Sequence, residues 1–362
     1  MTLTPKSPAP QNRAPPKLSP HTLPMALTMG DAAGIGPELA LQAWKDRFHD
    51  RLPKFVLYAD VDMMRAVARS AGVDGSLIVP VTDALAAAKV FDDALPVIPI
   101  PLAEPATPGA PTVANGPATI LAIRRAVADV AAGRASAVVT NPIAKSVLYG
   151  AGFEFPGHTE YLGALAAEFW PGEPSAPVMM LASSELRVVP LTIHVPLKDV
   201  PSLLTFDKIV ETARIMAASL KRDFGIPNPR IAVAGLNPHA GEDGALGSED
   251  AEIIRPAVEA LRAEGLDVTG PHAADTMFHE AARKTYDAAL AMYHDQGLIP
   301  IKTLSFDEGV NATIGLPFVR TSPDHGTAFA IAGKGLASAA SLKAALKLAG
   351  EMSARRSLAS AS

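Results

Sequence analysis

Residues 288–334 read AALAMYHDQGLIPIKTLSFDEGVNATIGLPFVRTSPDHGTAFAIAGK and carry candidate metal, anion and cofactor ligands one after another. An apolar run, typical of a buried strand, leads directly into a histidine and an aspartate. α/β proteins bind ligands at the carboxyl ends of such strands. The polar side chains that follow the strand are His294, Asp295, Lys302, Asn311, Arg320 and His325.

The rest of the chain alternates short apolar runs with helical patterns, which predicts an α/β fold. Two of the predicted strands form a hairpin, residues 178–182 and 186–191. The other predicted strands are 24–29, 55–59, 136–140, 230–236 and 288–293, and the predicted helices include 61–71, 82–90, 118–132, 208–224 and 249–264.

Composition excludes several classes of protein. The chain has 362 residues, 48% hydrophobic and 19% charged, with a net charge of -5 and no basic stripe, which argues against a nucleic-acid partner. No apolar run reaches the roughly 18 residues of a membrane span. Residues 1–23 are rich in proline and polar residues and lack a secretory signal, so we expect a disordered tail and a cytoplasmic protein. Because there is no cysteine, histidine and carboxylate are the available strong metal ligands.

The first glycine-rich stretch, GDAAGIGPE at residues 30–38, connects a predicted strand to a predicted helix. Its spacing is not the G-x-G-x-x-G of dinucleotide-binding folds, and no acidic residue follows at the expected distance. We therefore interpret it as a tight turn before the helix rather than as a Rossmann cofactor loop.

Three histidines follow predicted strands at or near the carboxyl ends. His194, His239 and His294 match the three protein ligands of an open metal site, in which substrate takes the remaining position. A single histidine in such a place is more often structural, and spacing does not prove that the three converge. Asp275 and Asp295 are the nearest carboxylates for ligation, orientation of a ligand or proton transfer.

Cationic and polar groups near these histidines suit a small anion. Lys302, Asn311 and Arg320 are spaced by nine residues each, and lysine or arginine near a metal favours phosphate or carboxylate. Thr159 has the character of a helix N-cap, which would direct His158 and free N–H groups at the same space. The alternatives are surface cations on loops and an ordinary capped helix with a surface histidine.

Long motifs in this chain resemble those of the 4-hydroxythreonine-4-phosphate dehydrogenase family of vitamin B6 biosynthesis, from about residue 26 to residue 349. The strings that carry the resemblance are GDAAGIGPE (30–38), PGHTEYL (156–162), TIHVPL (192–197), LNPHAGE (236–242), MYHDQG (292–297), GVNATIGLPFVRTSPDHGTAF (309–329) and AGKG (332–335). GDAAGIGPE (30–38) and HGTAFAIAGKG (325–335) are also similar to motifs of isopropylmalate and isocitrate dehydrogenases.

The resemblance implies an NAD- or NADP-dependent oxidation of 4-phosphooxy-L-threonine at C3, followed by loss of CO₂ to give 3-amino-2-oxopropyl phosphate. One divalent metal per subunit (zinc, magnesium or cobalt) would bind the three histidines named above. Substrate contacts fall on His158, Thr159, Lys302, Asn311 and Arg320, and the nucleotide on His325, Gly326, Thr327 and Gly333. Candidates for the base that takes the hydroxyl proton are Asp275 and Lys145.

The resemblance also implies a fold and an assembly. We expect a two-domain α/β/α sandwich, residues 24–145 with about 305–362 and residues 146–304, with the active site in the cleft between them at a homodimer interface. Two alternatives remain for the function. One is a related dehydrogenase of 4-phospho-D-threonate or 4-phospho-D-erythronate in sugar-acid catabolism, and the other is a non-catalytic metal- or phosphate-binding protein.

Overall fold

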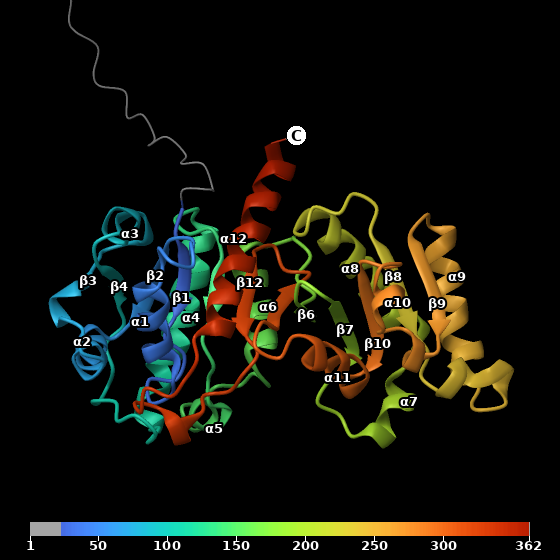
Figure 1. Cartoon of the computed structure of the whole chain (residues 1–362), viewed down its shortest axis with the longest axis horizontal. Helices are drawn as coiled ribbons and strands as arrows, with labels where there is room; N and C mark the ends of the chain where they lie inside the picture. Colours follow the sequence, from blue (N-terminus) through green and yellow to red (C-terminus); the bar gives the residue numbers. More distant parts are fainter. Residues whose placement is uncertain (1–22, 362) are drawn as a thin grey trace, which may run out of the picture.

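A computed structural model describes residues 23–361, and their strands form a single twelve-stranded sheet (Figure 1). The expected disordered tail lies outside these residues except for Leu23. The strand order is β3-β4-β2-β1-β5-β12-β11-β6-β7-β10-β8-β9. The predicted α/β class is confirmed.

Strands from the two predicted segments occupy opposite ends of the sheet. One end holds β1 (Met25–Thr28), β2 (Phe55–Ala59), β3 (Ile78–Pro80), β4 (Leu95–Pro99), β5 (Val138–Thr140), β11 (Val310–Ile314) and β12 (Arg320–Pro323). The other holds β6 (Val178–Ala182), β7 (Arg187–Thr192), β8 (Arg230–Ala234), β9 (Asp267–His272) and β10 (Ala288–Tyr293). The sheet continues between them through β11 and β6, and the two-domain division stays a prediction.

Strand direction changes only at the centre of the sheet among the described strands. The pairs β12–β11, β11–β6 and β6–β7 are antiparallel, and every other strand pair is parallel. The predicted hairpin is therefore confirmed as β6–β7. By contrast, the sequence patterns did not predict β11 and β12, which are short and separated by a Gly-Leu-Pro turn.

Every residue of β1, β2 and β5 is buried, since helices cover both faces of the sheet. The helices are α1 (Gly36–Lys45), α2 (Val61–Ser70), α3 (Ala84–Val90), α4 (Gly116–Ala131), α5 (Lys145–Gly150), α6 (His158–Phe169), α7 (Val200–Leu203), α8 (Phe206–Arg222), α9 (Arg255–Ala263), α10 (Glu280–Arg283), α11 (His294–Leu304) and α12 (Ala340–Ala361). The helix predicted at 249–264 begins with a π-helical turn, Asp250–Ile254, before α9. No helix of the described chain is long and apolar enough to cross a membrane.

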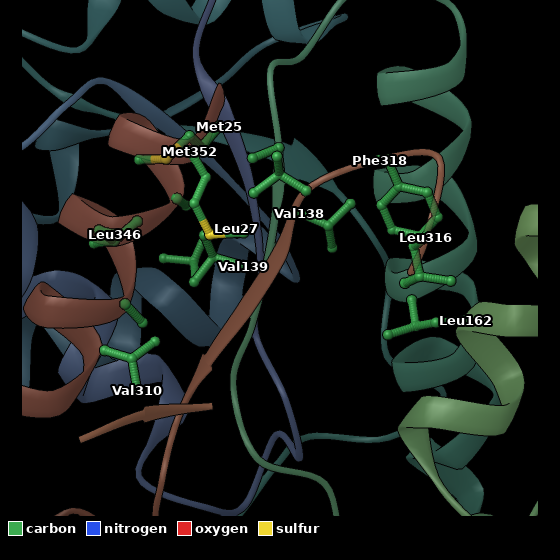
Figure 2. Close-up of a cluster of buried hydrophobic side chains, with 14 of the residues drawn as sticks. Met25, Leu27, Val138, Val139, Leu162, Val310, Leu316, Phe318, Leu346 and Met352 are labelled. Atoms are coloured by element: carbon green, nitrogen blue, oxygen red, sulfur yellow. The ribbon is translucent and has the colours of Figure 1, made fainter. Parts of the chain in front are cut away.

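The C-terminal helix closes the core over the middle of the sheet. Figure 2 shows Leu346 and Met352 of α12 packed toward Met25, Leu27 and Val139 of β1 and β5. These side chains are almost completely buried, and each stabilises the fold by about 1.5–3 kcal/mol. α12 also packs against β12 and β5, and these strands carry part of the site described below.

Candidate active site

Several helices that begin near predicted site residues lie along one side of the molecule. Figure 1 shows α5, α7 and α11 along the lower side, where they follow β5, β7 and β10 in the chain. Helices that follow parallel strands begin at the carboxyl ends of those strands, which is where α/β proteins place ligands. Two of these helices begin at predicted site residues, α5 at Lys145 and α11 at His294.

Arg320, the first residue of β12, is a buried cation held across three neighbouring strands. Its two terminal nitrogens donate hydrogen bonds to Thr313 Oγ1 of β11 at 2.9 Å and to Thr140 Oγ1 of β5 at 2.7 Å. Burial lowers the pKa of Arg320 to about 10, so the guanidinium stays charged at neutral pH. Its Nε has no hydrogen-bond partner among the described residues, which leaves a donor for an anionic ligand.

Asn311 lies on the same face of the sheet as Arg320. In the antiparallel β11–β12 pair, Arg320 stands opposite Thr313, and Asn311 is two residues along β11. The Oδ1 atom of Asn311 is buried and has no hydrogen-bond partner in the described chain. A buried amide without a partner is uncommon, so this atom is available to a polar ligand.

His158 begins α6 and contributes a third buried polar atom without a partner, Nε2. Burial, followed by the charges of Arg320 and Lys145, lowers the pKa of His158 well below its usual value. The prediction that Thr159 caps this helix is wrong: Gly157 is the N-cap, with extended backbone and no side-chain cap. Thr159 instead lies in the first turn, where backbone N–H groups lack intrahelical partners and suit an anion.

Lys145 links this anion-accepting region to the histidines of the second half. It begins α5, and its positive charge lowers the pKa of both His158 and His194. Its side chain lies close to the residue before α6, since a Cβ on Gly157 would stand 3.6 Å from Lys145 Nζ, an ordinary van der Waals contact. Lys145 therefore stands between the two groups of predicted ligands.

The three strands that precede the predicted metal ligands are parallel neighbours in the order β7-β10-β8, so their carboxyl ends share one edge. His194 follows β7, and His294 is the first residue of α11 after β10. Their rings lie 5.9 Å apart between centroids. Burial, then the charges of Lys145 and His294, lowers the pKa of His194, which favours the neutral imidazole that binds metals.

The hydrogen bond made by His294 also suits a metal ligand. Its Nδ1 lies 2.7 Å from Asp295 Oδ1, which leaves Nε2 free. A carboxylate on the second ring nitrogen commonly orients a metal-binding histidine. Asp295 thus fits the orienting role predicted for it.

His239 is not brought to this pair. It lies in η5 (Pro238–Gly244), where residues 239–243 all have positive φ. His194 also has positive φ, at 46°. Left-handed backbone at non-glycine residues costs about 1–3 kcal/mol each and concentrates at functional sites. Within the described residues no group of three or more His, Asp or Glu side chains is arranged to hold a metal ion.

Lys302 and Asp275, two other predicted site residues, have different surroundings. Lys302, in the last turn of α11, pairs with Asp324 at 2.8 Å, just before the cofactor loop. Asp275 is exposed in η7 (Ala274–Thr276), which packs against the η5 turn of His239. The two candidate bases therefore occupy different surroundings, Lys145 beside His158 and Asp275 beside the His239 turn.

The predicted cofactor loop lies against the N-terminal glycine turn. The carbonyl oxygen of Thr327 accepts a hydrogen bond from Ile35 N at 3.1 Å, and a Cβ on Gly34 would lie 3.0 Å from that oxygen. Gly333 N donates to Glu38 Oε2 at 3.0 Å. His325 Nδ1 lies 3.0 Å from the carbonyl oxygen of Gly326, and its buried Nε2 has no partner among the described residues.

Glu38 was not among the predicted site residues. The glycine spacing of residues 30–38 argued against a Rossmann loop, and the stretch was interpreted as a tight turn before the helix. The contact between Glu38 and Gly333 forms only when residues 327–333 fold back across the turn. Spacing alone gives no signal for a contact between residues so far apart in the chain.

Solved structures with a similar fold include dehydrogenases. The crystal structure of 4-hydroxythreonine-4-phosphate dehydrogenase from Klebsiella pneumoniae matches with a TM-score of 0.80 and 36% identity, covering 92% of this chain and 98% of that one. A terephthalate 1,2-cis-dihydrodioldehydrogenase from Burkholderia xenovorans matches with a TM-score of 0.61 and 27% identity, covering 91% and 98%. The fold and its relatives define an α/β dehydrogenase.

Sequence comparison gives the family. The model of the pyridoxal phosphate biosynthetic protein PdxA family matches residues 51–349. The 4-hydroxythreonine-4-phosphate dehydrogenase of Bradyrhizobium diazoefficiens is 55% identical over 339 residues, 92% of this chain and 98% of that protein. The chain belongs to the PdxA family, which confirms the predicted resemblance and the prediction of an oxidoreductase.

Proposed function

We propose that this chain oxidises the C3 hydroxyl of 4-phosphooxy-L-threonine with a nicotinamide cofactor and that the product then loses CO₂ to give 3-amino-2-oxopropyl phosphate, a step in pyridoxal 5'-phosphate biosynthesis. The observation that carries the proposal is the set of buried polar atoms without partners on His158, Asn311 and Arg320. These atoms match three of the five predicted substrate contacts. The names of the relatives support the same substrate.

The phosphate end of the substrate is assigned to Arg320, His158 and the first turn of α6, including Thr159. Arg320 is held by two threonines, so its Nε is fixed in direction before substrate binds. Burial lowers the pKa of His158 and so favours its uncharged form, whereas a phosphate dianion beside it would favour the protonated form. Asn311 and Lys302 are assigned to the other polar groups of the substrate.

His194, His239 and His294 are the residues we assign to a divalent metal. The neutral His194 and the His294–Asp295 pair have the chemistry of a metal-binding site, and imidazole ligands suit zinc or cobalt better than magnesium. A bound metal would supply a Lewis acid for the C3 oxygen. Because His239 lies apart from the other two, we propose that the set is completed at a homodimer interface, as the resemblance implies.

The protein residues then have distinct tasks. We assign proton removal from the C3 hydroxyl to Lys145 in its neutral amine form, which alone can accept a proton, since it lies beside both the anion site and His194, and keep Asp275 as the alternative base. Residues 325–327 and Gly333 position the nicotinamide cofactor, NAD or NADP, which accepts the hydride. We propose that the enzyme acts as a cytoplasmic homodimer.

The experiment that tests this function compares substrates. Formation of NADH or NADPH would be measured with 4-phosphooxy-L-threonine, 4-phospho-D-threonate and 4-phospho-D-erythronate, each with and without a chelator. We expect a kcat/KM for the amino acid at least tenfold above that for either sugar acid. A preference for a sugar acid would assign the chain to catabolism, and no turnover with any of them would favour a binding protein.

A further inference from the structure

A cavity of about 420 Å³ lies beside the cofactor loop, between α1 and α2. Its volume falls within the range of small-molecule sites. Met63, Ala66 and Val67 of α2 line it with apolar surface, and Gly333 and Gly335 line it with backbone that carries no side chain. An apolar wall beside exposed backbone suits a flat aromatic base joined to a polar group.

Glu38, in the first turn of α1, is a charged residue that lines this cavity. One carboxylate oxygen, Oε2, accepts a hydrogen bond from Gly333 N at 3.0 Å. The other, Oε1, is buried and has no hydrogen-bond partner among the described residues, and Glu38 lines the cavity. A buried carboxylate oxygen without a donor is costly, so its position favours a ligand that brings hydroxyl groups.

We propose that Glu38 binds the ribose hydroxyls of the adenosine half of the cofactor and thereby selects NAD over NADP. This inference rests on the proposed function and names the cofactor that the function leaves open. A carboxylate accepts hydrogen bonds from a ribose 2′-hydroxyl, whereas enzymes that use NADP place a cation at that position. A 2′-phosphate would set like charges against each other in a partly enclosed cavity.

The other charged residues that line the cavity, Lys45 and Asp46, do not take the place of Glu38 in binding the ribose. Asp46 pairs with Lys343 at 2.5 Å. Lys45 is exposed and lies seven residues beyond Glu38 on α1, about 10 Å along the helix axis. At that distance the charge of Lys45 does not offset the charge of Glu38, which is hydrogen-bonded to the cofactor loop.

Calorimetric titration of the whole protein with NAD⁺ and with NADP⁺, without substrate, tests the proposal directly. We expect the wild-type protein to bind NAD⁺ at least about tenfold more tightly. Glu38→Gln keeps an acceptor for Gly333 N but removes the charge, and it should reduce the preference to less than about threefold. Glu38→Asp should keep the preference, and Lys45→Gln is the matched control that changes a charge in the same cavity.

The outcomes of this titration test the role of Glu38 separately from the proposed function. An unchanged preference in Glu38→Gln, or a wild-type protein that favours NADP⁺, overturns the role of Glu38 but leaves the proposed dehydrogenase intact. A wild-type protein that binds neither dinucleotide overturns both the placement of the cofactor and this inference. Thermal melting of each variant shows that a lost preference is not lost folding.

Discussion

The imidazole rings of His194 and His294 lie 5.9 Å apart at the ends of two neighbouring parallel strands, β7 and β10. The two residues are separated by a hundred positions in the chain, and only the sheet brings them together. Lys145 lies near His194, and its charge also acts on His158 of the buried anion site. This relationship places a candidate metal site beside a candidate phosphate site.

Substitution of any one of the three predicted ligands should remove the metal. We expect His194→Asn, His239→Asn and His294→Asn each to lose most of the bound metal, measured by elemental analysis after purification at a fixed metal concentration. Loss of one of three protein ligands removes a large part of the affinity. His49→Asn, an exposed histidine far from any predicted ligand in the sequence, is the control. Full metal content in His239→Asn would remove that residue from the set.

Arg320→Lys should weaken binding of the phosphorylated substrate selectively. Lysine keeps the charge but cannot reach both threonines with a planar fork. We expect KM for the phosphorylated substrate to rise about 10- to 100-fold, and KM for the dephosphorylated analogue to change little. Arg214→Lys, at an exposed ion pair with Glu264, serves as the control. Equal effects on the two substrates would rule out a phosphate contact.

The buried histidine predicts how stability depends on pH. The pKa of His158 is lowered in the folded chain, so the unfolded chain takes up the proton first as pH falls below about 6.5. Stability from this group is fully present above that pH and is lost as pH falls, by up to about 1.4 kcal/mol per pH unit. His158→Asn should therefore flatten the loss measured by urea unfolding between pH 7 and pH 5.5. His194, whose pKa is also lowered, would retain part of the slope. A slope identical to that of the wild type would contradict the neutral, buried state of His158.

Among the ion-paired carboxylates that join the two ends of the sheet, we expect substitution of Asp223 to lower the free energy of unfolding the most. Asp223 is fully buried at the end of α8 and accepts hydrogen bonds at 2.8–2.9 Å from Arg222 and from Arg356 of α12. Asp223→Asn removes the buried carboxylate charge that faces two partly exposed arginines and should lower the free energy of unfolding by about 1–3 kcal/mol. The exposed pair of Arg214 and Glu264 gives the matched control, since Glu264→Gln should cost less than about 1 kcal/mol. A similar small cost at Asp223 would show that α8 and α12 are joined chiefly by apolar packing.

Elements with a strong local pattern could be predicted from the sequence. The hairpin of β6 and β7 and the strand of β10 are continuous apolar runs of the expected length, and the structure confirms them. β11 and β12 were missed because each is a short run with polar residues, one of them the buried Arg320. Their strand conformation depends on pairing with β6 and β5, which lie far away in the chain.

The chemistry of the site was harder to predict than its residues. The motif resemblance named His158, Asn311 and Arg320, but only the fold shows that each keeps a buried polar atom without a partner among the described residues. The cap at Thr159 was predicted wrongly because threonine is a common N-cap, whereas here Gly157, in extended backbone, precedes the helix. The left-handed turn that carries His239 has no local signal at four of its five residues, which are not glycine.

The most direct test of the proposed metal-dependent dehydrogenase is reconstitution of the metal-free protein. The protein would be stripped with a chelator and titrated with zinc, cobalt or magnesium while NADH formation from 4-phosphooxy-L-threonine is followed. We predict no turnover without metal and full recovery at one metal ion per subunit. Turnover by the stripped protein equal to that of the untreated protein would contradict a catalytic metal held by His194, His239 and His294.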